Sequence, residues 1–205
     1  MNTASPRSRL RAPESRQSGF SLVIVMIILV IVSMLGVAGS QMVLMAERSS
    51  RYDRDWQIAL QGAEAALVDA EFDIRGPNTG AAKRIDTFSP TSLLGFTAGC
   101  GVGGNLGLCL PNATGKPVWY DVDFTNATTA AKTVGLGDFT DRTFATGNAG
   151  LQPALRPRYI IEAIPDLLPG TSSTGPPKTL FRVTAMGFGP RTDTQAVLQM
   201  DFRKE

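Results

Sequence analysis

The clearest pattern along the chain is an apolar stretch from Phe20 to Ala46, which contains no Asp, Glu, Lys or Arg. A helix rises about 1.5 Å per residue, so this stretch forms a rod of about 40 Å, against a bilayer hydrocarbon core of about 30 Å. Because each unpaired backbone group costs several kcal/mol in lipid, a stretch that spans a membrane has to be helical. The pattern therefore predicts one transmembrane helix over residues 20–46.

Beyond Ala46 the pattern stays helical but becomes amphipathic, and no proline interrupts it before Gly76-Pro77, a pair that ends helices. Steps of four and three define one apolar stripe along a helix, made of Trp56, Leu60, Ala63, Leu67, Ala70 and Ile74. The face that we expect to contact solvent carries Arg51, Arg54, Asp55, Glu64 and Asp69. Residues 47–75 thus continue the first helix in one rod that ends at Ile74, and the stripe is predicted to pack on a following sheet.

The rest of the chain, residues 76–205, predicts a loop-rich β domain, because glycine and proline are frequent and sustained periodicity is rare. Apolar and polar residues alternate in four segments, which predict strands at 118–124, 158–164, 180–188 and 195–202. Consecutive strands joined by short links pair antiparallel and can bury one face against a helix. The predicted fold class is α+β: a long N-terminal helix, half membrane-spanning and half amphipathic, packed on a C-terminal antiparallel β-sheet with long irregular loops.

The chain has two cysteines, Cys100 and Cys109, in the glycine-rich segment CGVGGNLGLC. In a periplasmic or extracellular domain this pair predicts a disulfide, which would stabilise the fold by about 2–3 kcal/mol through chain entropy. In a cytoplasmic domain the pair would be two free thiols. The spacing differs from the C-x-x-C of redox motifs.

Composition limits the chemistry that the chain can perform. Histidine is absent, which excludes Ser-His-Asp and Cys-His catalysis and nearly every zinc site built on imidazole. The net charge is +2 and no run of Lys or Arg occurs, so we predict no direct nucleic-acid binding. Asp121 and Asp123 alternate along a predicted strand, which is more typical of a solvated face than of an acid–base or cation site. We therefore predict no enzyme activity, no catalytic residue, no cofactor and no metal site.

The residues before the apolar stretch are basic, with four arginines against one acid, Glu14. This excess predicts a cytoplasmic N-terminus and a globular domain on the opposite, periplasmic side of the membrane. Three kinds of segment fit the pattern. They are a cleaved secretory signal, for which Val37-Ala38-Gly39 is a poor cleavage site, a plain single-pass anchor, and a leader that is removed ahead of the apolar stretch.

At the junction, the sequence Arg16-Gln17-Ser18-Gly19-Phe20-Ser21-Leu22 puts a Gly-Phe pair at the start of the apolar stretch. This arrangement resembles the class III leader of type IV prepilins and pseudopilins. The resemblance implies that prepilin peptidase cuts between Gly19 and Phe20, removing the basic leader 1–19, and that the new Phe20 amine is methylated. Most pilins carry Glu at the fifth position of the mature chain, where this sequence has Ile24. That departure favours a rare subunit, as at a filament tip, over a bulk building block.

Further segments are similar to PilX-type minor pilins, which usually lack the fifth-position Glu. Ala46-Glu47-Arg48 and the later ALQGAEAAL, residues 59–67, resemble the AER…A(F/L)QAAEAAL pattern of that family. Other landmarks follow in the family's order, namely Cys109, PVW at 117–119, PRYIIE at 157–162, FRVTA at 181–185 and VLQ at 197–199. The resemblance spans residues 16–202.

The resemblance implies a minor pilin that waits in the bacterial inner membrane and then enters a type IV pilus at the cell surface. It implies partners as well: other minor pilins, the major pilin, a tip adhesin, prepilin peptidase and the assembly platform. The expected role is to initiate or assemble pili that serve twitching motility, adhesion or DNA uptake. A K-type pseudopilin of type II secretion, which also lacks the Glu, and an anchored periplasmic binding module or enzyme are the alternatives.

Overall fold

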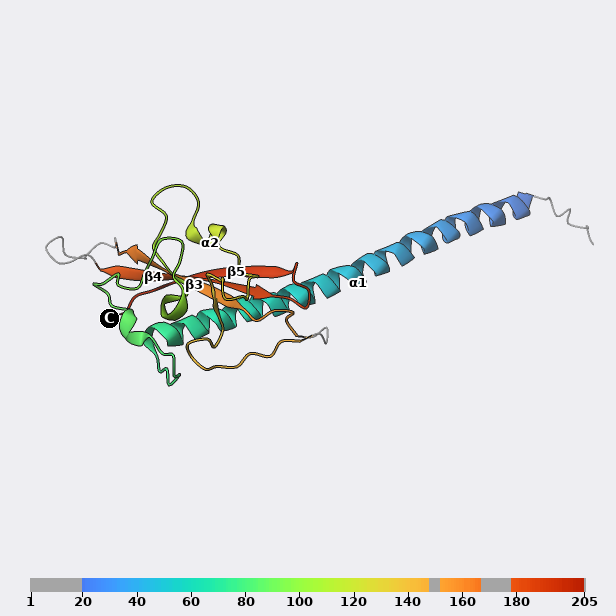
Figure 1. Ribbon diagram of the computed structural model, residues 1–205. Helices are drawn as coiled ribbons and strands as arrows, with labels where there is room; N and C mark the ends of the chain where they lie inside the picture. Colours follow the sequence, from blue (N-terminus) through green and yellow to red (C-terminus); the bar gives the residue numbers. More distant parts are fainter. Residues whose placement is uncertain (1–19, 148–151, 167–177, 205) are drawn as a thin grey trace, which may run out of the picture. The chain divides into compact units, whose positions relative to one another are not determined.

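The computed structural model describes residues 20–147, 152–166 and 178–204. The chain divides into two compact units between Ser49 and Ser50, and each unit is considered by itself. One helix, α1, runs from Phe20 to Arg75 and belongs to both units (Figure 1). It ends one residue later than predicted. Gly76 follows with a φ of 76° and donates its N–H to Phe72 O at 3.0 Å, the left-handed glycine cap that ends many helices.

The second unit contains a five-stranded sheet in the order β1-β3-β4-β5, with β2 also paired to β3. Its three long strands are β3 (Arg158–Pro165), β4 (Thr179–Phe188) and β5 (Gln195–Phe202), and they pair antiparallel as predicted. Two strands of two residues each were not predicted: β1 (Leu108–Cys109) is parallel to β3 and β2 (Val134–Gly135) is antiparallel to it. The fold class is therefore α+β, as expected, with a mixed edge on an antiparallel sheet.

The strand predicted at residues 118–124 is wrong. The segment begins with one helical turn, α2 (Val118–Asp121), in which the Tyr120 N–H bonds to Pro117 O at 3.0 Å. Val118 and Phe124 are buried beside the two cysteines, whereas Tyr120, which a strand would have buried on the same face, is 59% exposed. The alternation of apolar and polar residues over 118–124 thus arises because Val118 and Phe124 are each buried separately, one from the helical turn and one from the loop after it. Two 3₁₀ turns, η1 (Ile85–Thr87) and η2 (Gly103–Asn105), complete the regular structure of the described residues.

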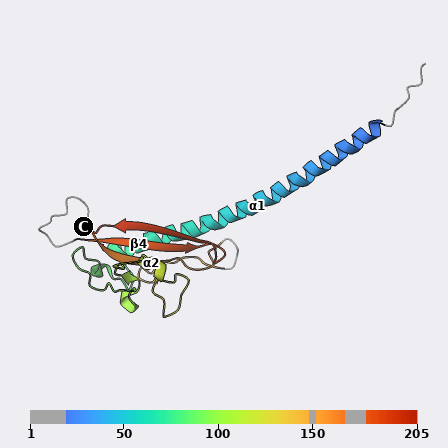
Figure 2. The same ribbon diagram turned by 90° about the horizontal axis from the view of Figure 1, so that it is seen from above.

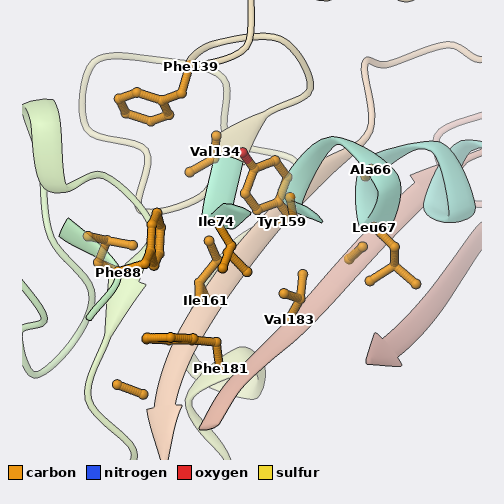
Figure 3. Close-up of a cluster of buried hydrophobic side chains, with 14 of the residues drawn as sticks. Ala66, Leu67, Ile74, Phe88, Val134, Phe139, Tyr159, Ile161, Phe181 and Val183 are labelled. Carbon is orange, nitrogen blue, oxygen red and sulfur yellow. The ribbon is translucent and has the colours of Figure 1, made fainter. Parts of the chain in front are cut away.

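Two hydrophobic cores cover the two faces of the sheet. In the larger one, the last turns of α1 face the odd-numbered residues of β3 and β4, and the loops close the end of the cluster (Figure 3). Its members include Ala66, Leu67, Ala70, Ile74, Phe88, Tyr159, Ile161, Phe181 and Val183. The smaller core lies on the opposite face, where α2 and the irregular loops gather on one side of the strands (Figure 2). This core joins Ile160 and Phe188 to the cysteine segment.

The helix and the sheet approach closely at Gly187 of β4. A Cβ on Gly187 would overlap the backbone of Ala59 and Ala63, so at this point only a hydrogen fits between strand and helix. Gly62 lies in the same contact, close to Pro157 and Gly187. Small residues on both elements therefore allow a backbone-to-backbone approach that larger side chains would prevent.

Candidate assembly surface

The first unit presents an uninterrupted apolar surface along α1. From Phe20 to Met45, every large apolar side chain is exposed, by between 43% at Ile24 and 72% at Met42. Within the described residues, α1 is the one helix long and apolar enough to cross a membrane. Soluble proteins rarely leave so large an apolar surface uncovered, because its hydration is costly. This surface therefore requires lipid or other protein around it.

The polar side chains within this surface are compatible with an apolar environment. The Ser33 hydroxyl donates to Leu29 O at 2.7 Å, and the Ser40 hydroxyl donates to Val37 O at 2.8 Å. Both hydroxyls are thus satisfied inside the helix, as is common for serine in membrane helices. A Cβ on Gly36 or Gly39 would meet nothing within 4 Å, so both glycines leave open positions on the helix surface.

The structure describes one half of the predicted processing junction. Phe20 is the first residue of α1 and is 70% exposed, whereas Gly19 and the leader 1–19 lie outside the described residues. Ile24 lies one turn further along the same helix, with its side chain 43% exposed. A carboxylate at this position would therefore face whatever surrounds the apolar surface.

The stripe that was predicted to pack on the sheet extends over fewer residues than expected. Ala63 and Ala70 are fully buried, Leu67 is 9% exposed and Leu60 is half-buried. Trp56 is 45% exposed, so the prediction that it packs in this core is wrong. Near this turn the helix meets the connection after β4 through its backbone, with Asp55 O against Gly189. The Trp56 ring therefore lies outside the core.

The last turns of α1 are joined to the loops by a buried ion pair that the sequence did not reveal. Arg84 donates from Nε and Nη2 to the Asp73 carboxylate at 2.7–3.1 Å, and Tyr159 Oη donates to the same carboxylate at 3.0 Å. Nη1 of Arg84 donates to Leu106 O at 2.6 Å, and the guanidinium lies 3.6 Å from the centre of the Phe139 ring. Asp73 is thereby joined directly to Arg84 and β3, and through Arg84 to the segments that carry Leu106 and Phe139.

Asp69 was predicted to contact solvent and is instead fully buried. Its carboxylate accepts hydrogen bonds from the Thr140 hydroxyl and, at 2.9 Å, from the Gly137 N–H, which ties the loop after β2 to the helix. Burial raises the pKa of Asp69, while these two hydrogen bonds and Arg142 lower it and Asp73 raises it further. The helical pattern misplaced this residue because it shows where apolar side chains lie and does not show which acids find partners.

The predicted disulfide between Cys100 and Cys109 is present. Both cysteines are buried, at 3% and 0% exposure, in the smaller core with Val118 and Phe124. The bond therefore closes the glycine-rich loop against the face of the sheet opposite α1.

On that face, Glu162 of β3 is 4% exposed, and its Oε2 has no hydrogen-bond partner among the described residues. Its neighbour across the sheet, Arg182, donates to Asp201 at 3.0 Å instead. Burial raises the pKa of Glu162, which Arg182 lowers and Asp201 raises further. In the described ranges, no group of three or more Asp, Glu or Cys side chains is arranged to hold a metal ion.

A helix that is apolar and exposed in its first part, and buried under an antiparallel sheet in its last turns, defines a pilin-like protein. Two family models match the chain in order, one described as PilX N-terminal at residues 18–68 and one as Type IV pilus assembly protein PilX C-term at residues 105–204. Between them they cover most of the sequence, and the chain belongs to the PilX family of type IV pilus assembly proteins. Comparisons with curated proteins and with solved structures found no match.

Proposed function

We propose that the chain is a minor pilin that is processed by prepilin peptidase and helps to initiate type IV pili, in a priming complex or at the tip. The observation that carries this proposal is the exposed apolar part of α1, which continues without a break into the helix that the sheet covers. A single helix can thus anchor the domain in the inner membrane and later pack among other pilin helices.

The physical step is the transfer of the helix from lipid to protein. Its apolar surface is covered in the bilayer by acyl chains and in a filament by neighbouring helices, so the two environments are close in free energy. Extraction therefore needs external work, which the assembly platform would supply. The role is structural and requires no catalytic group on this chain.

Processing is tested by mass spectrometry of the mature protein. The expected N-terminus is N-methylated Phe20, with residues 1–19 absent. A chain that begins at Met1 in membranes would instead indicate an ordinary single-pass anchor. The matched variant is Gly19→Ala, in which the leader should remain attached while the amount of protein stays unchanged.

The position of the subunit in the filament is tested at Ile24. A buried carboxylate there would carry a desolvation cost of several kcal/mol unless a neighbouring terminal ammonium paired with it. We propose that this subunit has no such neighbour, so Ile24→Glu should lower pilus number and its own recovery in sheared pili. Ile28→Glu, one turn further along α1, is the control for a carboxylate at any apolar position. It should lower recovery of the subunit in sheared pili at least as strongly as Ile24→Glu. If Ile24→Glu left both quantities unchanged, the tip or priming argument would fail.

The proposed location is the inner membrane with a cytoplasmic N-terminus and a periplasmic domain, followed by the pilus at the cell surface. The Cys100–Cys109 disulfide supports an oxidising compartment for the domain. The proposed partners are other minor pilins, the major pilin and a tip adhesin.

Deletion of the gene should abolish surface pili and leave protein export intact. Loss of export with pili retained would favour a K-type pseudopilin of type II secretion, and loss of neither would favour an anchored binding module.

A further inference from the structure

A pocket of about 400 Å³ lies in the second unit. It is lined by the turn at residues 127–131, by η2 and by the side chains of Asp138, Arg156 and Arg158. The two arginines come from the start of β3 and the residues just before it, so the backbone of the sheet fixes their spacing.

Arg158 is a buried cation, and no carboxylate of the described residues forms a hydrogen bond or ion pair with it. It is 6% exposed, and its guanidinium donates from Nε to Thr133 Oγ1 at 2.6 Å and from Nη2 to Thr133 O. Both acceptors are neutral, and within the described residues no acceptor is assigned to Nη1. A buried charge that is held by neutral groups alone is unfavourable until a counter-charge reaches it.

Among the residues that line the pocket, the one acid, Asp138, is already engaged by other donors. Asp138 is engaged by Arg156 Nη2 at 2.5 Å and by the Gly135 N–H at 2.7 Å. Burial lowers the pKa of Arg158 most, Asp138 and the exposed Asp123 raise it, and Arg156 lowers it again by repulsion. The lining of the pocket therefore has two cations and one anion.

The rim of the pocket is held in place before any ligand arrives. The Arg156 guanidinium lies directly on Gly135, where a Cβ would overlap it, and the Asp138 pair fixes its direction. Thr128 is fixed too, since its hydroxyl and its N–H both donate to Asn126 Oδ1, at 2.7 and 2.9 Å. Guanidinium groups that are fixed in this way favour planar oxyanions, which they bind through paired hydrogen bonds.

We propose that this pocket binds the carboxylate of an acidic side chain from a neighbouring pilus subunit. The carboxylate approaches Nη1 of Arg158 and the exposed edge of Arg156, and its negative charge neutralises the excess positive charge of the pocket lining. Carboxylate recognition follows from the pocket alone, whereas the identity of the partner rests on the proposed function.

The first test is NMR of the full chain in detergent micelles, labelled with ¹⁵N-arginine and titrated with N-acetyl-glutamate N-methylamide. The Nε–Hε signals of Arg156 and Arg158 should shift and saturate, and those of Arg182 should not. Arg182 is the matched control because it also lies in the sheet unit and pairs with one carboxylate, at similar exposure (39% against 44% for Arg156). The neutral N-acetyl-glutamine N-methylamide should cause no shift. Absent shifts, or equal shifts at Arg182, would overturn the site.

The second test separates the possible sources of the anion. Arg156→Gln should weaken binding of the glutamate probe about tenfold, the effect of losing one charge-assisted hydrogen bond, while Arg182→Gln should not. Inorganic phosphate is titrated in parallel, and saturation by phosphate with no response to the glutamate probe would overturn the carboxylate assignment.

In cells, Arg156→Glu should reduce recovery of the subunit in sheared pili at least fivefold relative to Arg182→Glu. Normal recovery of Arg156→Glu would overturn the subunit partner. A deletion strain that still makes pili would instead overturn the proposed function, so the two failures are distinguishable.

Discussion

Replacement of Arg84 by glutamine measures how strongly the loops are fixed to the end of α1. The substitution removes three donor contacts to the Asp73 carboxylate and the bond to Leu106 O, and it leaves Asp73 fully buried with Tyr159 as its donor. Breaking one partner of a buried ion pair typically costs about 3–5 kcal/mol, because the remaining charge is uncompensated. For a domain of this size, that loss lowers the Tm by roughly 6–20 °C.

The assay is thermal unfolding of the full chain in a fixed detergent, followed by near-UV circular dichroism, which reports the packing of the aromatic core. The control is Arg182→Gln, which also removes an arginine–aspartate pair, at 3.0 Å, but one whose side chains are 39% and 46% exposed. Exposed pairs contribute about 0–1 kcal/mol, so this control should unfold within a few degrees of the parent chain.

A double substitution tests the cause of the effect. Asp73→Asn combined with Arg84→Gln removes both charges, so the pair together should cost less than the sum of the two single losses, by about 1–3 kcal/mol. An Arg84→Gln chain that unfolds at the same temperature as the Arg182→Gln control would contradict this explanation. So would a double variant whose loss of stability equals the sum of the two single losses.

Three further predictions use the same unfolding assay. Gly187→Ala should destabilise the domain by about 1–3 kcal/mol, because its Cβ would overlap the backbone of Ala59. The control is Gly104→Ala, whose Cβ meets nothing within 4 Å and which should not destabilise the domain. Equal effects of the two variants would contradict the close approach at Gly187. Glu162→Gln should stabilise the chain at pH 7 by about 1 kcal/mol. Because burial raises the pKa of Glu162 in the folded state, the carboxyl contributes stability that is lost as the pH rises through that raised pKa. The difference between parent and variant should disappear below pH 4.5, the ordinary pKa of the group, where the carboxyl is neutral in the folded and the unfolded state. Replacing both Cys100 and Cys109 with serine should cost about 2–3 kcal/mol, and reductant should lower the Tm of the parent chain and leave that of the variant unchanged.

Periodicity predicted those parts of the fold whose side chains alternate between one apolar and one polar environment. The end of α1 and the bounds of β3, β4 and β5 differ from the prediction by one residue at most. The pattern failed at residues 118–124, where Val118 and Phe124 are buried from a turn and a loop. A short alternating segment gives the same signal in both cases.

Long-range polar contacts left no local signal in the sequence. Asp69 and Asp73 look like other acids on an amphipathic helix, and their partners Thr140 and Arg84 lie in loops without periodicity. The two-residue strands β1 and β2 were missed for the same reason, since pairing with β3 defines them and they have no pattern of their own. The candidate pocket around Arg158 likewise depends on segments that meet only in the folded chain.

The unbroken course of α1 has a mechanical consequence. A pull along α1 passes through the backbone hydrogen bonds of the helix to the turns that carry Asp69 and Asp73. There the load is shared between the β2 loop, through Gly137 and Thr140, and the Arg84 segment. The contact of Ala59 and Ala63 with Gly187 of β4 lies before these turns along α1, so tension on the helix is shared between the sheet and the buried charged contacts.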